Sequence, residues 1–449
     1  MFKNNSITER FKKTNEEEKK TYRENPVLSK IIQWSKLISI TAGAQLLIQA
    51  LGFISGILII RLLPVEEYAF YTLGNTILGT MVVLADGGIA TGVTAIYGRV
   101  WKTKKEAGRV VISGLELRKK FAVISLIVGI PVLFFLLRHH NASWLLATLM
   151  VLSLIPAFLS SLSATIYEIP LLFHQEIVPL QKNHLKVNVG RLILLFATVF
   201  IFPWAFMAIL AGGIAQFAGN LGLKKLAGKR INWAQDPDPL MKKEMLGFVK
   251  KLMPGAIYYC VSGQITVWLI SVFGATNTIA EIGALGRLAM ILTIVSSVFH
   301  TVITPRFIKL KNKKNQLLKK YLMIILALIF LSIGILLLFW IFSTQALEIL
   351  GSTYEGLERE LVLFLGASCL ELIVGICFVL NSNKGWLVNP YINILVGISS
   401  ISMGIVLFDI STLNGILLFK LFSAFVIFLF YVIFGISSIL KLPNSKIVS

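Results

Sequence analysis

Acidic residues are scarce in this chain. There are 22 aspartates and glutamates against 43 lysines and arginines, which gives a formal net charge of +21. Charged residues make up only 14% of the 449 residues, whereas hydrophobic residues make up 56% and the mean hydropathy is +0.79. Ordinary soluble domains carry about 25% charged residues. The composition therefore excludes a soluble globular protein and predicts a polytopic membrane protein.

Cysteine is rarer still, and the common catalytic motifs are missing. The three cysteines, Cys260, Cys369 and Cys377, each stand in an apolar run, so we expect them to pack, with neither a disulfide framework nor a metal cluster. The sequence contains no G-x-x-x-x-G-K-[ST] loop, no H-E-x-x-H and no G-x-S-x-G. These absences favour transport over catalysis, and they imply no cofactor.

Twelve stretches are long and apolar enough to cross a bilayer as helices, which takes about 20 residues each. Six precede a basic cytoplasmic linker at 223–251 and six follow it, which predicts an all-α fold with two six-helix lobes, 37–222 and 252–440, around a central cavity. The remaining segments are predicted as a disordered arm without a signal peptide (1–25), an interfacial amphipathic helix (26–36) and a tail (441–449). The expected spans are 37–60, 69–97, 121–137, 144–167, 187–202, 205–222, 252–274, 279–304, 321–343, 360–380, 387–408 and 414–439.

The cations occupy alternate connections between the spans. Nine fall between Lys3 and Lys36, eight in 98–120, eight in 223–251 and seven in 305–320, whereas the intervening connections hold at most one each. Cytoplasmic loops of membrane proteins are enriched in lysine and arginine, so this pattern predicts that both termini and every basic loop are cytoplasmic. It explains the positive charge without a nucleic-acid partner, and it suits the basic loops to anionic membrane lipids.

Polar side chains gather on the first two spans of each predicted lobe. Gln45 and Gln49 are four residues apart in the first span and so share a helix face. Asn75 stands in the second span, and Tyr259 and Gln264 stand in the seventh. Polar groups in a bilayer must be paired or must face water, so these residues predict a wet, substrate-binding cleft between the lobes. Hydrogen bonding between helices is the alternative, and for the two glutamines the sequence does not decide between them.

Arg287 is the residue whose charge most needs an explanation. It lies about two helical turns below the outer end of the eighth span, and a lone charge near the bilayer centre costs roughly 2.5–3.5 kcal/mol. A guanidinium presents a planar fork of donors that matches phosphate oxygens, so a polar cleft beside it predicts anion binding. Snorkelling to the outer surface is the alternative. Arg61 is a second candidate, whereas Arg191 is close enough to the inner face to reach water and is not counted.

Two acidic residues within spans are candidates for ion coupling. Asp86 stands in the segment ADGGIATG, where a structural cap or an ion pair with Arg99 is the preferred alternative. Glu371 lies in the middle of the tenth span, and a structural ion pair with Lys420 of the twelfth span ranks ahead of a proton-relay role. Dependence on a H⁺ or Na⁺ gradient would rest on these two carboxylates.

Two segments carry a resemblance to a known family. They are RLLPVEEYAFYTLGNTILGTMVVLADGGIATGVTAIYGR (61–99) and EIGALGRLAMILTIVSSVFHTVITPRFIKL (281–310). With the twelve spans, they make the chain resemble the polysaccharide (O-antigen-type) flippases of the multidrug/oligosaccharidyl-lipid/polysaccharide exporter superfamily.

The resemblance implies a V-shaped pair of lobes whose cavity is lined by spans 1, 2, 7 and 8. It also implies transfer of an undecaprenyl-pyrophosphate-linked oligosaccharide from the inner to the outer leaflet of a bacterial cytoplasmic membrane, alongside other polysaccharide-assembly proteins. Arg287 falls on the span where family members carry cavity cations. The long charged N-terminal arm departs from the family pattern.

Other functions fit parts of the sequence. A multidrug or toxic-cation exporter would share the fold, but its cavity should favour acidic residues over Arg287. Flippases for the peptidoglycan lipid precursor typically have fourteen spans. A membrane-embedded polysaccharide polymerase or glycosyltransferase belongs to a different class, and it would need a large external loop where every outer connection here is short.

Overall fold

The structure, a computed structural model, describes residues 26–299, 303–308, 310, 314–386 and 388–442. Side chains are described from residue 43 onward, except those of residues 259, 305 and 308. Within these ranges the chain is helical and contains no strand, as the sequence predicts. The predicted arm (1–25) and most of the predicted tail fall outside them.

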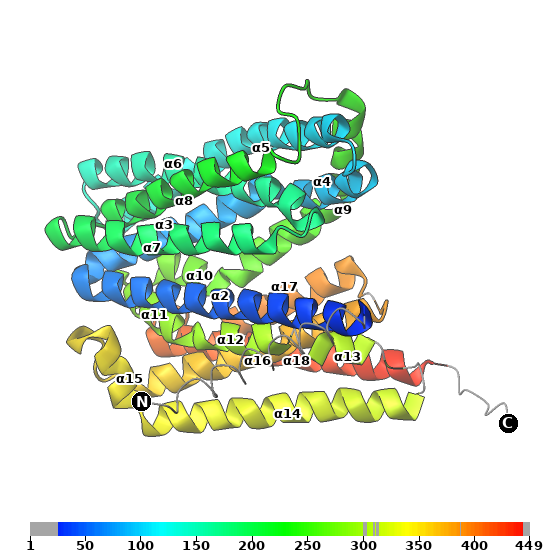
Figure 1. Cartoon of the computed structure of the whole chain (residues 1–449). Coiled ribbons are helices and arrows are strands. Elements are labelled where there is room, and N and C mark those ends of the chain that lie inside the picture. Colours follow the sequence, from blue (N-terminus) through cyan, green and yellow to red (C-terminus); the bar gives the residue numbers. More distant parts are fainter. Residues whose placement is uncertain (1–25, 300–302, 309, 311–313, 387, 443–449) are drawn as a thin grey trace, which may run out of the picture.

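The helices divide between the two halves of the chain (Figure 1). The N-terminal bundle consists of α2 (Pro26–Leu62), α3 (Val65–Asp86), α4 (Ile89–Val100), α5 (Lys104–His139), α6 (Trp144–Phe173), α7 (Ile177–Ile201) and α8 (Ala205–Ala227). The C-terminal bundle consists of α9 (Pro239–Gly263), α10 (Ile265–Phe273), α11 (Thr276–Ala289), α12 (Ile291–Val298), α13 (Thr304–Ile308), α14 (Lys314–Ile341), α15 (Ser343–Leu350), η2 (Ser352–Tyr354), α16 (Glu358–Asn383), α17 (Pro390–Leu407) and α18 (Leu413–Leu440).

Eleven of the described helical segments are long and apolar enough to cross a membrane, and the bent pair α9 and α10 makes a twelfth if it counts as one span. The hairpin between α7 and α8 is present where the sequence predicts it, around Phe202, Pro203 and Trp204. The segment predicted as a separate interfacial helix, 26–36, instead continues without a break into the first span as α2. The linker is also shorter than predicted, because helices extend into it from both sides and leave only 228–238 between them.

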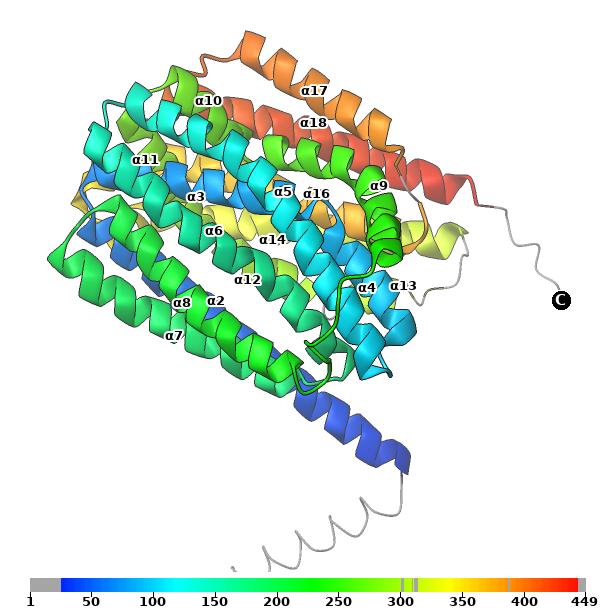
Figure 2. The ribbon, with the colours of Figure 1, turned by 90° about the horizontal axis from the view of Figure 1, so that it is seen from above.

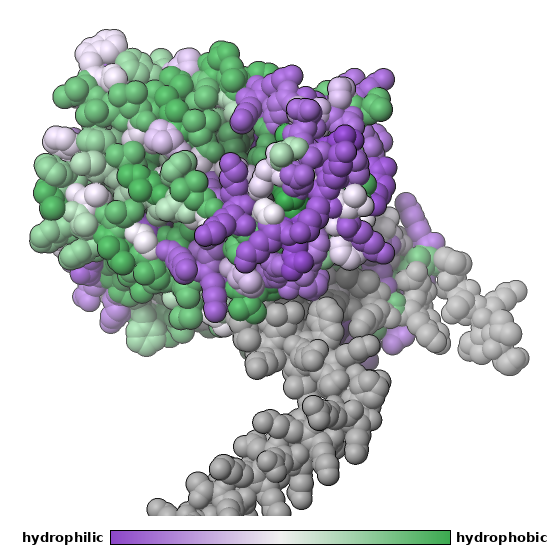
Figure 3. All heavy atoms as spheres, turned by 45° about the horizontal axis from the view of Figure 1, so that its top comes forward, coloured by the Kyte–Doolittle hydropathy of each residue, from purple (hydrophilic) through white to green (hydrophobic). Residues whose placement is uncertain are grey.

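The surface has the pattern of a protein embedded in lipid. Large apolar side chains face outward along the spans, for example Phe330, which is 79% exposed, and Val406, which is 85% exposed. Polar and charged side chains gather at one end of the molecule, beside a broad apolar surface (Figure 3). We call this end, where α8 leads to α9 and α14 begins, the basic end, and we call the opposite end, where α2 meets α3, the far end.

The two bundles pack together where α3 lies against α11 (Figures 1 and 2). One continuous apolar cluster joins them there and includes Leu73 of α3 and Leu285 of α11. Toward the basic end, described residues form two separate clusters instead: in one, around Val93 and Met245, α9 packs against helices of the N-terminal bundle, and the other, around Phe307 and Tyr321, lies within the C-terminal bundle. The far half of the molecule is therefore closed across the seam between the bundles.

Candidate functional site

Arg287 lies in the seam between the two bundles. Its helix, α11, packs against α3, and the guanidinium carbon is 6.0 Å from the centre of the Tyr71 ring. Tyr68, one helical turn earlier, also interacts electrostatically with Arg287, and its ring stacks on that of Tyr71 at 6.0 Å. Both tyrosines are 1% exposed. The arginine of the C-terminal bundle is thus held against an aromatic wall of the N-terminal bundle.

Helix α2 makes room for this side chain with a glycine. A Cβ atom at Gly56 would lie 2.9 Å from Cδ and 3.3 Å from Nε of Arg287. Any larger residue here would push the guanidinium away from Tyr71. Arg287 also places Nη1 3.9 Å from the sulfur of Met290, which is a weak acceptor. Three helices from two bundles therefore define the position of one charge.

A second arginine reaches the same tyrosine from within the N-terminal bundle. Nη2 of Arg191, in α7, donates to the Tyr71 hydroxyl at 3.4 Å, and its Nε is buried with no hydrogen-bond partner in the described ranges. The expectation that Arg191 reaches water at the inner face is therefore wrong. Its side chain instead contacts the second turn of α3, which begins at the far end, because Tyr71 supplies an acceptor there.

In the described part of the chain, neither arginine has an acidic partner. Among the described residues, no carboxylate lies within 4.0 Å of the guanidinium of Arg191 or Arg287. A partly buried charge without a counter-ion is costly, because it has lost water without gaining an opposite charge. Tyrosine hydroxyls and ring faces compensate only part of that cost. The arrangement is suited to an anion that both guanidiniums can reach.

The other predicted cleft residues lie on the same helices but do not all converge. Gln45 and Gln49 are half-buried on α2 and form no hydrogen bond with the rest of the described chain. The side-chain amide of Asn75 donates to the carbonyl of Tyr71 at 2.9 Å, one turn away on α3. Asn75 is thus adjacent to the arginine pair, whereas the glutamines have free polar groups along α2.

The remaining candidates are at the edges of this region. Gln264 is exposed and occupies the break between α9 and α10, where the chain bends by 55°. The side chain of Tyr259 lies outside the described residues. Arg61 is exposed at the far end, where it donates to the carbonyls of Ile349 (2.9 Å) and Glu348 (2.6 Å) in the last turn of α15. This contact stabilises a helix C-terminus.

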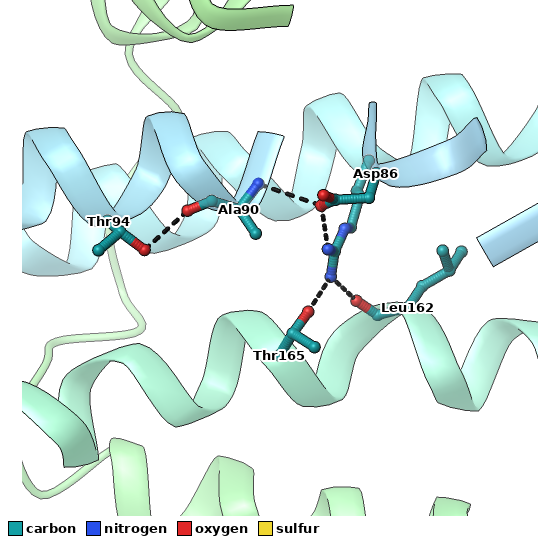
Figure 4. Close-up of polar contacts among 6 residues, drawn as sticks. Asp86, Ala90, Thr94, Leu162 and Thr165 are labelled. Carbon is teal, nitrogen blue, oxygen red and sulfur yellow. Dashed lines mark hydrogen bonds and ion pairs between the residues drawn. The ribbon is translucent and has the colours of Figure 1, made fainter. Parts of the chain in front are cut away.

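Asp86 belongs to a network inside the N-terminal bundle (Figure 4). It accepts from the backbone N–H of Ala90 at 3.1 Å, which caps α4 after a sharp turn in which Gly87 and Gly88 have φ of 48° and 98°. It also pairs with Arg118 of α5, which is 5% exposed. Arg118 in turn donates to α6, at the Leu162 carbonyl and at the Thr165 hydroxyl (2.6 Å).

Of the two structural roles predicted for Asp86, the structure shows the cap, whereas the ion pair with Arg99 is wrong. Arg99 is exposed and pairs with Glu244 of α9 at 2.5 Å. The physical reason is the packing of the helices. Arg118 lies on α5, which packs against α3, and a buried charge is costly unless an opposite charge is beside it, so Asp86 and Arg118 compensate each other.

Glu371 and Lys420 form the ion pair that the sequence predicts, with 3.3 Å between Nζ and Oε2. Lys420 is 13% exposed at its side chain, donates to Ser368 at 3.1 Å and lies 3.9 Å from the centre of the Phe364 ring. Glu371, at 52%, is much more exposed.

Sequence reasoning missed the tyrosine wall. Tyr68 and Tyr71 stand in the segment EEYAFYTLGN, where their three-residue spacing gives one helix face and was a readable signal. The charge of Arg191 is visible in the sequence, but the predicted direction of its side chain, toward the inner face, is wrong. No group of three metal-ligating side chains comes together in the described part of the chain.

The sequence matches no protein-family model and no curated protein. The fold does match solved structures. One is the lipid II flippase MurJ in an inward closed conformation, with a TM-score of 0.71 and 13% identity over 90% of this chain and 88% of that one. Another is an inward-facing multidrug resistance MATE family transporter of the MOP superfamily, with a TM-score of 0.68 and 14% identity over 89% of this chain and 96% of that one.

An outward-facing MATE family transporter of the same superfamily matches less well, with a TM-score of 0.56 and 13% identity over 90% of this chain and 95% of that one. At these identities the likeness shows the fold alone.

Proposed function

We propose that the protein is a membrane transporter of the multidrug/oligosaccharidyl-lipid/polysaccharide exporter superfamily that flips a polyprenyl-pyrophosphate-linked oligosaccharide between leaflets. The observation that carries this proposal is the pair of arginines, Arg191 and Arg287, that meet at Tyr71 from different bundles without an acidic partner among the described residues. The matched structures include a lipid II flippase and multidrug transporters. They are transporters and flippases rather than enzymes.

A pyrophosphate suits this site for two reasons. It carries enough negative charge to neutralise both guanidiniums, and its oxygens accept their planar forks of donors. The half-buried Gln45, Gln49 and Asn75 are hydrogen-bonding groups of the kind that a glycan needs, and they lie on α2 and α3, the two helices that contact Arg287. The lipid tail would stay in the membrane while the polar head crosses the seam.

The charge pattern gives the direction. If the basic end is cytoplasmic, as the positive-inside rule indicates, the closed far half blocks the outer side of a bacterial cytoplasmic membrane. The described conformation then corresponds to loading from the inner leaflet. Export to the outer leaflet supplies lipid-linked units for cell-surface polysaccharide, where other assembly proteins would use them.

Coupling to a H⁺ or Na⁺ gradient is part of the proposal. Glu371 is the first candidate, because half of its side chain is exposed beside Lys420. Asp86 is the second, because its carboxylate already accepts from Arg118 and from the backbone of α4.

Export of drugs or toxic cations is the second candidate function, since MATE transporters share the fold. The two candidate functions require ligands of opposite charge beside Arg287, an anion for the flippase and a cation for the drug exporter. Purified full-length protein in detergent would be titrated with undecaprenyl pyrophosphate and, separately, with tetraphenylphosphonium, with binding followed by native mass spectrometry. We expect the pyrophosphate lipid to bind and the cation not to displace it. Saturable binding of the cation alone would favour the drug exporter.

A further inference from the structure

A groove at the basic end of the N-terminal bundle is separate from the arginine pair. It has a volume of about 570 Å³ and is lined by Leu221, Lys224, Lys225, Gly228, Lys229 and Trp233. The lining thus contains three cations, one indole and no acidic residue. A volume of this size is in the range of sites for small ligands, about 300–1,000 Å³.

The groove continues into the apolar surface of the same helix. Ile214, Phe217 and Leu221 recur along one face of α8 and are 48%, 58% and 56% exposed. Lys224 and Lys225 follow Leu221 by three and four residues, so they continue that face into the last turn. An exposed apolar stripe that ends in adjacent lysines is complementary to a lipid, because the acyl chains can lie along the stripe and the anionic headgroup can contact the lysines.

Trp233 is held in place rather than free at the surface. Its ring lies edge-on to that of Tyr167 in α6, with 5.6 Å between centres, and Nζ of Lys224 is 5.7 Å from the indole ring centre. The neighbouring Asn232 donates its backbone N–H to the carbonyl of Lys104 at 3.0 Å, which fixes the loop to the start of α5. Tryptophan prefers the headgroup level of membranes, because its ring is apolar and its N–H is polar.

We propose that this groove binds one phospholipid with an acidic headgroup from the leaflet at the basic end. Lys224, Lys225 and Lys229 neutralise the phosphate and the headgroup charge, the Trp233 indole sits at the glycerol level, and the acyl chains follow Ile214, Phe217 and Leu221. Snorkelling lysines attract anionic lipids in general, but the fixed indole beside three lysines and the apolar stripe that leads to them define a discrete site. This lipid is distinct from the transported substrate.

The test is native mass spectrometry of the full-length protein in detergent, titrated with phosphatidylglycerol. We expect one tightly bound lipid, and we expect the double variant Lys224→Gln/Lys225→Gln to bind it roughly thirty-fold more weakly, since each lysine near a headgroup contributes about a factor of five. The matched control is Lys319→Gln/Lys320→Gln, another exposed adjacent pair in α14 near the basic end, and it should keep the affinity. Equal loss in both variants, or no loss in the first, would overturn the proposal.

Further arms separate the sources of a bound phosphate. Inorganic phosphate at millimolar concentration should not displace the lipid, because it lacks the apolar tails, and Trp233→Leu should weaken binding several-fold without changing the charge. Undecaprenyl pyrophosphate binding should be unchanged in the Lys224→Gln/Lys225→Gln variant. Its parallel loss would make the groove part of the substrate path and would overturn the assignment of a resident lipid, while the arginine proposal would stand.

Discussion

Arg191 and Arg287 approach the same tyrosine from different bundles. Arg191 donates to the Tyr71 hydroxyl at 3.4 Å, and the Arg287 guanidinium carbon lies 6.0 Å from the ring centre. Tyr71 therefore lies between two positive charges, which repel each other in a medium of low dielectric constant. An anion that entered between them would replace repulsion with attraction on both sides of the seam.

This relationship predicts that the contributions of the two arginines to anion binding are strongly coupled. Arg191→Ala and Arg287→Ala should each weaken undecaprenyl pyrophosphate binding by roughly 10- to 100-fold, because hydrogen bonds to charged groups contribute about 1.5–3 kcal/mol. The double variant should lose less than the product of the two, since one ligand uses both groups. Binding by native mass spectrometry and surface polysaccharide in cells are the measurements.

The control for the arginine variants is Arg359→Ala, which removes an exposed arginine from the first turn of α16. Membrane insertion should match the wild type in all variants. Export at the wild-type level by Arg287→Ala would remove this residue from the mechanism.

The hydroxyls of Tyr71 and Tyr97 provide a test variant and its matched control. Tyr71→Phe removes the acceptor of Arg191 and should lower the unfolding free energy by about 1–3 kcal/mol, because a buried charged donor loses its partner. Tyr97 is 0% exposed and its hydroxyl has no hydrogen-bond partner among the residues that the structure describes, so Tyr97→Phe should be neutral or stabilising. Thermal unfolding in detergent compares the two, and equal effects would contradict the assigned role of Tyr71.

The Asp86 network predicts a large stability effect. Asp86→Asn should lower the unfolding free energy by about 3–5 kcal/mol, because Arg118 would remain buried without its counter-ion. Glu106→Gln breaks an exposed i,i+3 pair with Arg109 (3.2 Å) and should cost at most about 1 kcal/mol. If denaturant unfolding shows Asp86→Asn to be as mild as this control, the network is not structural.

Ion coupling is tested at Glu371. Transport of a lipid-linked glycan in proteoliposomes should lose its dependence on a H⁺ or Na⁺ gradient in Glu371→Gln, because the variant lacks the half-exposed carboxylate to which we assign the coupling ion. Glu355→Gln, at an exposed site outside the spans, is the control. Transport by the wild type that ignores both gradients would end the coupling proposal.

His140 predicts a pH dependence at the far end. Its ring nitrogens form hydrogen bonds with the Ser271 carbonyl (2.8 Å) and the Thr276 hydroxyl (3.0 Å), which link the end of α5 to the C-terminal bundle. Burial lowers the pKa of His140 below its ordinary 6.5, the Ser271 carbonyl opposes this shift and the neighbouring His139 adds to it. The unfolded chain therefore binds the proton more readily, so stability is complete above pH 6.5 and falls as the pH drops toward the lower folded pKa.

Thermal unfolding between pH 8 and pH 5 measures this effect. The wild type should lose stability on acidification, and His140→Gln should lose less. His174→Gln, which alters a histidine at the end of α6 bonded only locally to Pro170 (2.9 Å), should keep the wild-type profile. A flat wild-type profile would contradict the role assigned to His140.

The helical architecture was predictable because a helix that crosses a bilayer needs a long run of apolar residues, and such runs are visible in the sequence. The Glu371–Lys420 pair was also predictable, since two opposite charges at similar depth in lipid have few other partners. The direction of Arg191 and the partner of Asp86 were not, because both depend on which helices are neighbours. The spacing of residues along one helix shows which of them share a face, whereas tertiary packing decides which residue of another helix lies opposite that face.

The bent element formed by α9 and α10 has a mechanical consequence. The start of α9 is fixed to the N-terminal bundle by Glu244 with Arg99 and by Lys242 with Glu116, whereas Tyr258, farther along, packs against Gly397 of α17. Helix α9 is therefore clamped to both halves of the molecule. Any rocking of one half against the other must twist or bend α9 between Glu244 and Tyr258, a segment that contains Pro254, so the stiffness of this segment would govern how quickly the protein changes the side of the membrane to which it opens.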